Sequence, residues 1–433
     1  MDRLHFKIFA ILVLISFSTS AFAQHEKRWL KRQISILSEP NKLGRGYVRN
    51  GHESAERYVL REIKSFGLLP VTADSSYTQT YSFPVNTFPD IVSVIVNKGF
   101  RKKELEPGVD FLVDAGSNSF NVDNMKVRTV DLSAIPDTAA WNKTKATWQT
   151  SNRIYLLKNV DSFCRKMSIR LWSFAKQLPK GCFIIPQHGK LTWTVATDTI
   201  PATVLYIEDT VITKRIRKAS VYIHSVFLPA SKNKNENIMA YVPGTVKDSF
   251  IVFTAHYDHL GMMGSTATFP GASDNASGTA MLLYLANYFA AHPQHYSIAF
   301  IAFSGEEAGL LGSHYFVEHP MIPLDHIKFL TNIDIMGDAT DGITVVNATE
   351  FPKEFDLLQQ INNKKDYLPA IKSRGKAANS DHYFFTEAGV PSFFIYSNGG
   401  KGYYHDVFDK SSEVTLENVD MVARLLIDFA AQF

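Results

Sequence analysis

The sequence has 433 residues, of which 45% are hydrophobic, 20% charged and 12% aromatic. This length favours two or three domains over a single core, and the composition excludes extensive disorder. The formal net charge of +3 excludes a protein built to bind a polyanion such as nucleic acid.

The chain begins with the three parts of a secretory signal peptide. Arg3 and Lys7 supply positive charge, residues 8–17 form an apolar run too short to span a membrane, and Ala21-Phe22-Ala23 provides a small-residue cleavage pattern. We expect residues 1–23 to be removed and the protein to be exported, either to the periplasm or by secretion. An uncleaved anchor is the alternative. No later segment has the pattern of a membrane span.

Two cysteines, Cys164 and Cys182, are present. Export permits a disulfide, but the sequence leaves their pairing open. Two thiolates cannot complete a tetrahedral zinc site, so any metal must be held by histidine and carboxylate side chains.

The sequence pattern of the first half of the chain changes near residue 96, from helical spacing to short β-type runs. Residues 51–67 carry apolar side chains at helical spacing. The segment 24–95 is therefore expected to begin with a helical stretch. Between residues 96 and 230, short β-type runs at 153–157 and 183–186 flank a predicted helix at 162–177. The polar stretch 231–237 resembles a linker.

From residue 238 the pattern alternates between strands and helices. The predicted helices lie at 278–292, 307–318 and 411–433. The predicted strands lie at 250–255, 298–303, 329–335, 343–346 and 392–396. This alternation predicts an α/β fold with a mostly parallel mixed sheet and helices on both faces.

Polar side chains recur just past the ends of these predicted strands, where functional groups of α/β sheets gather. The first cluster is A-H-Y-D-H-L-G at 255–261. His256 and Asp258 share a face of an extended backbone, and a carboxylate so placed can hold the second ring nitrogen of a ligand histidine. A histidine-rich surface turn is the alternative.

Asp274 lies in G-A-S-D-N-A-S-G at 271–278, at the entry to a predicted helix. Such residues also serve as turn and N-cap residues. However, the two oxygens of one carboxylate can bridge two cations held about 3.5–4 Å apart.

Glu306 and Glu307 follow the strand 298–303, within G-E-E-A-G-L-L-G-S at 305–313. Adjacent glutamates are common at exposed helix starts. Neighbouring carboxylates also point in different directions, so one can bind metal while the other acts as a general base.

The last two clusters are N-I-D-I-M-G at 332–337 and Y-H-D-V-F-D at 404–409. Asp334 lies inside an apolar strand, where a carboxylate is costly unless it is paired or bound to metal; Asp338 is the alternative ligand. His405 with Asp409 repeats the arrangement of His256 with Asp258, so Asp409 is expected to orient His405.

Together with N-S-D-H-Y-F-F at 379–385, this ordered set resembles metallopeptidase family 28, the co-catalytic zinc aminopeptidases. The resemblance is strong over residues 238–433 and weaker over 24–95, where it rests on G-R-G-Y at 44–47. It implies the three-layer α/β/α zinc-exopeptidase fold, with residues 231–433 as the main part of the peptidase domain and 24–95 as its N-terminal part.

The resemblance also implies two zinc ions and a role for each site residue. One ion takes His256, Asp274 and Asp334, and the other takes Asp274, Glu307 and His405. Glu306 is then the general base that activates a shared water, and Asp258 orients His256. The implied reaction is hydrolysis of peptide bonds at the free N-terminus of peptide substrates. Asp381 and His382 are expected near the substrate pocket.

Residues 96–230 fall where some members of that family carry a protease-associated domain, and are expected to form a smaller inserted α+β domain that acts as a lid. A glutaminyl cyclase with a single zinc on the same fold is the main functional alternative. A non-catalytic binding protein is disfavoured because all the ligand positions and Glu306 are present. The sequence has no G-x-S-x-G elbow near a strand end, which disfavours a serine hydrolase.

Overall fold

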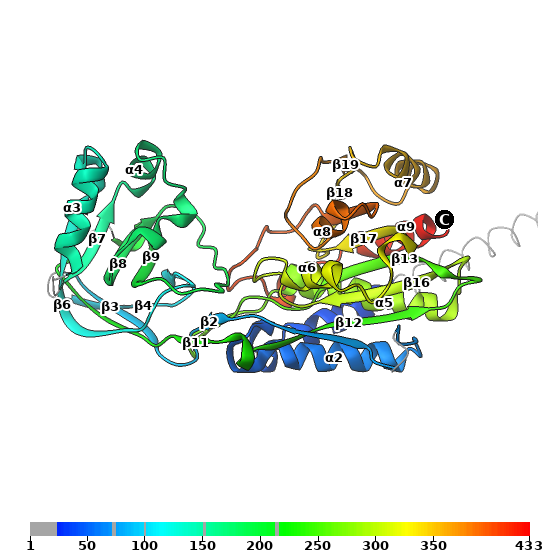
Figure 1. Ribbon diagram of the computed structural model, residues 1–433, viewed down its shortest axis with the longest axis horizontal. Coiled ribbons are helices and arrows are strands. Elements are labelled where there is room, and N and C mark those ends of the chain that lie inside the picture. Colours follow the sequence, from blue (N-terminus) through cyan, green and yellow to red (C-terminus); the bar gives the residue numbers. More distant parts are fainter. Residues whose placement is uncertain (1–23, 72–74, 99–100, 150–152, 213–215) are drawn as a thin grey trace, which may run out of the picture.

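The computed structural model describes residues 24–71, 75–98, 101–149, 153–212 and 216–433. The predicted signal peptide, residues 1–23, lies outside these ranges. The described chain forms two lobes, a larger one and an inserted one (Figure 1). Within the described ranges, no helix combines the length and the apolar character needed to cross a membrane.

The larger lobe is built on a mixed sheet whose strand order is β1-β12-β16-β13-β17-β20-β18-β19. The central strands β16, β13, β17 and β20 are parallel neighbours. β12 pairs antiparallel with β1 and β16, and β18 pairs antiparallel with β20 and parallel with β19. The strand bounds are Thr78–Ser82 (β1), Lys234–Val242 (β12), Val246–His256 (β13), Tyr296–Phe303 (β16), Ile327–Ile333 (β17), Ile343–Val346 (β18), Ile371–Ser373 (β19) and Ser392–Ser397 (β20).

Helices cover both faces of this sheet, as the sequence predicts. Successive residues of β13 point to opposite faces, so Phe253 packs in one apolar cluster and Val252 in another. The larger cluster is completed by residues 24–37, which are helical, and by α2 (Gly51–Ser65), α5 (Gly278–Ala291), α7 (Pro352–Lys365) and α9 (Val419–Ala430). The smaller cluster is completed by α6 (Leu311–Glu318) and α8 (His382–Glu387).

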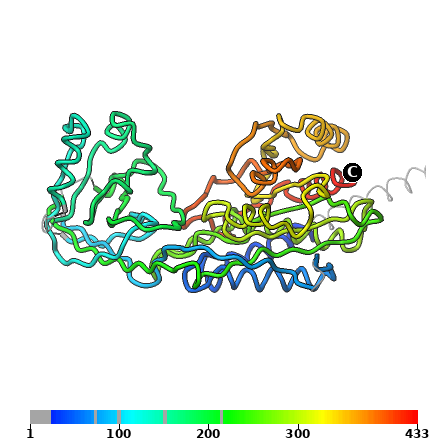
Figure 2. Tube along the Cα trace, viewed as in Figure 1, coloured from blue at the N-terminus to red at the C-terminus, as the bar shows by residue number. Residues whose placement is uncertain are grey.

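The inserted lobe is the cyan-to-green part of the chain in Figure 2. Its sheet has the order β4-β3-β10-β6-β7-β8-β9-β5. The elements are β3 (Val92–Lys98), β4 (Arg101–Leu105), β5 (Phe111–Val113), β6 (Phe120–Asp131), α3 (Thr138–Gln149), β7 (Ile154–Lys158), α4 (Val160–Lys166), β8 (Gly181–Gln187), β9 (Ala202–Glu208) and β10 (Lys218–Ile223). The boundary expected between residues 95 and 96 therefore falls inside β3.

Two short ribbons lie where the lobes meet. One pairs β2 (Val85–Thr87) with β11 (Val226–Leu228), and the other pairs β14 (Gly261–Met263) with β15 (Ala267–Phe269). Side chains of the second ribbon pack in the same apolar cluster as the strands of the inserted lobe. The two lobes are therefore joined by a shared core.

The two cysteines are free thiols in the structure. Both are buried, and they lie in different apolar clusters of the inserted lobe. Burial raises the pKa of each thiol, which disfavours the reactive thiolate.

Two of the predicted helices have different bounds in the structure. The helix expected at 162–177 ends at Lys166, because the backbone at Ser168 turns left-handed. The helix expected from 307 starts at Leu311, since Gly305, Gly309 and Leu310 have positive φ.

The predicted linker 231–237 was wrong in its second half, which begins β12. This segment pairs with β1, and Asn235 lies opposite Tyr81. Its polar side chains are satisfied inside the protein; for example, the Asn237 amide donates to the Gly312 carbonyl at 2.9 Å. The polar composition of residues 234–237 therefore led to the prediction of a linker where β12 begins.

Candidate metal centre

Three neighbouring parallel strands bring the central residues of the candidate site together. His256 is the last residue of β13, Glu307 follows β16, and Asp334 follows β17. In the sheet these strands lie in the order β16-β13-β17, so their carboxyl ends share one edge. Asp274 lies on the irregular turn η8 (Ala272–Ser277) before α5, and His405 lies on the loop between β20 and α9.

The first group of potential ligands surrounds Nε2 of His256. This atom lies 3.3 Å from Oδ1 of Asp334 and 3.5 Å from Oδ1 of Asp274. All three side chains are buried, and their ligand atoms lie within 4.8 Å of one another. These are distances across which one cation can contact all three residues.

The second group surrounds Nε2 of His405, which lies 3.1 Å from Oδ2 of Asp274 and 3.2 Å from Oε2 of Glu307. Asp274 thus presents one oxygen to each histidine. The five residues expected as ligands therefore meet in one place.

The donor set fits divalent cations such as zinc. Nε2 of His256 and Oδ1 of Asp334 are buried, and neither makes a hydrogen bond of good geometry with a described residue. Buried polar atoms normally have a partner, so these two atoms indicate a binding position for a cation. Imidazole and carboxylate are both zinc donors.

Charges within the site shift the pKa values of its members. Burial acts to lower the pKa of His256, but the Glu306 and Asp334 carboxylates raise it well above its usual value. Burial likewise opposes the charged form of His405, yet Glu307 and Asp274 raise its pKa to about 11. Without a cation, the carboxylates thus hold both imidazoles in the protonated form.

Glu306 faces the first group, with Oε2 4.0 Å from Nε2 of His256. Burial raises the pKa of its carboxyl group well above the usual value; His256 opposes this, and the nearby Glu307 and Asp381 add to it. A carboxyl group with a raised pKa can both accept and return a proton near neutral pH.

Asp258 is fully buried beneath the site. Its main-chain carbonyl lies 3.2 Å from Nδ1 of His256, and its carboxylate oxygen Oδ1 lies 3.7 Å from the same nitrogen. The carboxylate also accepts hydrogen bonds from the Tyr47 hydroxyl at 2.6 Å and from the main-chain N–H groups of Glu306 and Glu307. Asp258 therefore fixes the turn that carries both glutamates as well as His256.

Arg45, from the G-R-G-Y segment, lies under the site with no exposed surface. It is surrounded by site carboxylates that include Asp274 and Asp409, although burial lowers its pKa to about 10. Its guanidinium group donates to the main-chain carbonyls of Leu37, Tyr257, Pro270, Gly271 and Asp274.

We expect Arg45→Met to lower the free energy of unfolding by about 3–5 kcal/mol, because it leaves buried carbonyls and carboxylates without their cation. Denaturant unfolding of the metal-free protein measures this. Arg57→Met is the control, since Arg57 is 66% exposed and pairs with Glu53 one helical turn away. Equal stability of the two variants would contradict the role given to Arg45.

The expected role of Asp409 was wrong. Its carboxylate accepts from the main-chain N–H groups of Ser273 and Asp274, at 2.8 and 3.0 Å, and so supports the backbone that carries Asp274. Nδ1 of His405 instead lies 2.9 Å from the carbonyl oxygen of Trp193, a residue of the inserted lobe.

Other sequence candidates lie at the edge of the site. Asp338 binds the Thr340 N–H and the Thr415 hydroxyl and joins neither ligand group. Asp381 and His382 are buried, and burial raises the pKa of Asp381 to about 7.

Sequence reasoning missed His259 and Tyr404. Nδ1 of His259 lies 2.6 Å from Oε1 of Glu307, which turns the other oxygen of Glu307 toward His405; His259 also groups with Asp274 and Glu307 as a possible ligand. The Tyr404 ring stacks on the His405 ring at 3.9 Å between centroids. Their only sequence signal is proximity to His256 and His405.

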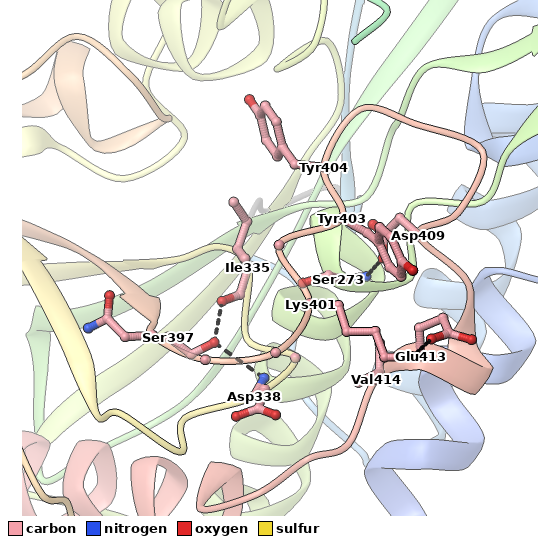
Figure 3. Close-up of a pocket in the computed structure, with 15 residues that line it drawn as sticks. Ser273, Ile335, Asp338, Ser397, Lys401, Tyr403, Tyr404, Asp409, Glu413 and Val414 are labelled. Atoms are coloured by element: carbon pink, nitrogen blue, oxygen red, sulfur yellow. Dashed lines mark hydrogen bonds and ion pairs between the residues drawn. The ribbon is translucent and has the colours of Figure 1, made fainter. Parts of the chain in front are cut away.

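A pocket of about 350 Å³ adjoins the site (Figure 3). Its wall includes Ser273, Ile335 and Tyr404, each next in sequence to a candidate ligand. In Figure 3, the Tyr404 ring projects away from Ser397 and Asp338. The pocket therefore lies beside the candidate ligands.

Comparison with known proteins gives the decisive observation. The sequence profile of peptidase family M28 matches residues 237–430, which contain all five candidate ligands and Glu306. Through these residues, this part of the chain is similar to peptidase family M28. The M28 region forms the larger lobe, apart from the N-terminal helical layer and β1.

Curated relatives match part of the chain. Aminopeptidase YwaD of Bacillus subtilis is 28% identical over 195 residues, which are 42% of this chain and 41% of YwaD. Leucine aminopeptidase 1 of Sclerotinia sclerotiorum is 30% identical over 175 residues, which are 37% of this chain and 45% of that protein. The chain thus spans less than half the length of the curated relatives it matches.

Solved structures resemble nearly the whole chain, including its insert. An aminopeptidase from Aneurinibacillus sp. strain AM-1 has a TM-score of 0.61 at 20% identity, with 94% of this chain and 93% of that chain covered. A peptidase M28 precursor from Shewanella amazonensis SB2B has a TM-score of 0.65 at 15% identity, with 95% of each chain covered. These similarities confirm the expected fold.

Proposed function

We propose that this protein is an exported metallo-exopeptidase that binds two zinc ions and removes residues from the free N-terminus of peptides. The supporting observation is the placement of Asp274, whose two oxygens face two different histidines at 3.5 and 3.1 Å. One carboxylate shared in this way is how two-metal sites are held together. The names of the curated relatives, which include aminopeptidases and zinc metalloproteases, agree with this function.

In this proposal His256, Asp274 and Asp334 hold one ion, and Asp274, Glu307 and His405 hold the other. When bound, such ions polarise a carbonyl group and make water more nucleophilic. Each ion has three protein ligands, which leaves room for water and substrate.

The remaining steps fall to residues of the chain. Glu306 accepts the proton of the attacking water and returns it to the leaving amine, a role suited to its raised pKa. Asp258 positions His256 and the turn that bears Glu306. The predicted signal peptide directs this activity to peptides outside the cytoplasm, in the periplasm or the medium.

A panel of aminoacyl anilides, each with a free or an acetylated amine, tests the proposed function together with metal analysis. We expect hydrolysis of the free-amine substrates only, and two zinc ions per chain. One tightly bound zinc with cyclisation of glutaminyl peptides would instead identify the cyclotransferase alternative. Inactivity of the zinc-loaded protein on the whole panel would indicate a binding protein.

Metal binding is expected to release about two protons per chain near neutral pH, because ligand imidazoles must be neutral. In the metal-free protein the pKa of His405 is about 11 and that of His256 is also raised, so both start protonated. Raising the pH removes the competing protons, so apparent affinity should rise by about tenfold per pH unit for each proton. Calorimetry in buffers of different ionisation enthalpy counts the protons; pH-independent affinity would contradict the assignment.

A further inference from the structure

The loop that carries His405 lies against the inserted lobe. In Figure 2 the orange-red segment after β20 extends from the larger lobe to the inserted one. The main-chain N–H of Trp193 donates to the His405 carbonyl at 2.9 Å, and the Trp193 carbonyl lies 2.9 Å from Nδ1 of the His405 ring. Both main-chain polar groups of Trp193 are therefore used on this one histidine.

Trp193 is itself firmly held. It is 7% exposed, its ring stacks on Phe269 at 4.7 Å between centroids, and its indole N–H donates to the Val113 carbonyl at 2.7 Å. The carbonyl that faces His405 is thus fixed relative to β5 of the inserted lobe and to β15 of the larger lobe.

A carbonyl group only accepts hydrogen bonds, so Nδ1 of His405 must carry the hydrogen. This fixes the ring so that the other nitrogen, Nε2, faces Asp274 and Glu307. Partners of this kind orient ligand histidines and set metal affinity.

A second contact fixes the same loop. Nζ of Lys190 lies 2.7 Å from Oδ2 of Asp406 and donates to the Gly402 carbonyl at 2.9 Å. Asp406 is buried, and its carboxylate also accepts from the main-chain N–H groups of Tyr404 and Phe408. Lys190 therefore neutralises the carboxylate that closes the turn around His405.

The two proposed metal positions differ in which lobe supplies the partner of the histidine Nδ1 atom. Nδ1 of His256 is held by the Asp258 carbonyl, two residues away in the larger lobe. Among the described residues, the contacts of this ring nitrogen come from Asp258 in the larger lobe. His405 depends on a residue 212 positions away.

We propose that Lys190 and Trp193 of the inserted lobe are positioning residues for His405 and selectively set metal affinity at the position formed by Asp274, Glu307 and His405. This inference rests on the proposed two-metal function. It gives the insert a role in building the metal centre, distinct from that of a lid.

The test is zinc titration of the full-length protein against a chromophoric chelator, which resolves the two equivalents. In Trp193→Ala we expect one equivalent to weaken by about 10–100-fold and the other to keep its wild-type affinity. Lys190→Met should weaken the same equivalent to a smaller extent. Activity of both variants should return at excess zinc.

Lys176→Met is the matched control, because Lys176 pairs with Asp198 on the surface of the inserted lobe at 2.8 Å. Should Trp193→Ala not fold, Lys190→Met decides the question. Wild-type affinity for both equivalents in the variants, or equal weakening of both, would overturn the inference. A wild-type protein that binds a single zinc would instead refute the proposed two-metal function, since that measurement does not involve the insert.

Discussion

Replacing Glu306 with alanine is expected to lower kcat by about 10²–10⁴-fold, the contribution typical of general acid–base catalysis, while zinc content stays at the wild-type level. The expectation follows from the position of the Glu306 side chain and from the raised pKa of its carboxyl group. Glu306 faces the site 4.0 Å from Nε2 of His256 but belongs to neither ligand group, and its pKa is raised chiefly by burial.

Steady-state kinetics and metal analysis on the same preparation test this expectation. Glu318→Gln is the control, because Glu318 is 56% exposed at the end of α6 and pairs with His314. A Glu306→Ala variant with near wild-type kcat would remove Glu306 from the proton-transfer step. Loss of zinc along with activity would make it a ligand instead.

Replacing His405 with alanine is expected to remove one zinc ion per chain and to lower kcat/KM by about 10³-fold or more. Metal assistance contributes several kcal/mol to the transition state, and each 1.4 kcal/mol corresponds to about a factor of ten. The remaining ion should stay, because His256, Asp274 and Asp334 are untouched. Inductively coupled plasma mass spectrometry after dialysis gives the zinc content.

His188→Ala provides the matched control for this variant. The His188 side chain is 94% exposed on the inserted lobe and pairs with Asp209, far along the chain from the ligand groups. Its zinc content and activity should equal those of the wild type. Retention of two zinc ions in His405→Ala would transfer the ligand role to another residue, of which His259 is the best placed.

The central strands and their terminal residues could be predicted because their signals are local. The run that ends at His256 is apolar and β-branched, as buried parallel strands are. Once adjacent strands are parallel, their carboxyl ends meet, so His256, Glu307 and Asp334 converge without further information.

Contacts that depend on tertiary packing have no local pattern in the sequence and could not be predicted from it. The carbonyl of Trp193 can orient His405 only because the inserted lobe packs against the loop, and a main-chain group has no sequence signature. Arg45 was noted only as part of a short motif, since nothing local shows that its five acceptors come from distant turns. Asn237 looked like part of a linker because its side-chain partners, Gly312 on α6 and Gln79 on β1, are remote in sequence.

The most direct test of the two-metal centre is a crystal structure of the zinc-loaded protein with anomalous data collected at the zinc absorption edge. The account predicts two peaks on either side of Asp274, one in contact with His256 and Asp334 and the other with Glu307 and His405. A single peak, or peaks away from Asp274, would contradict it.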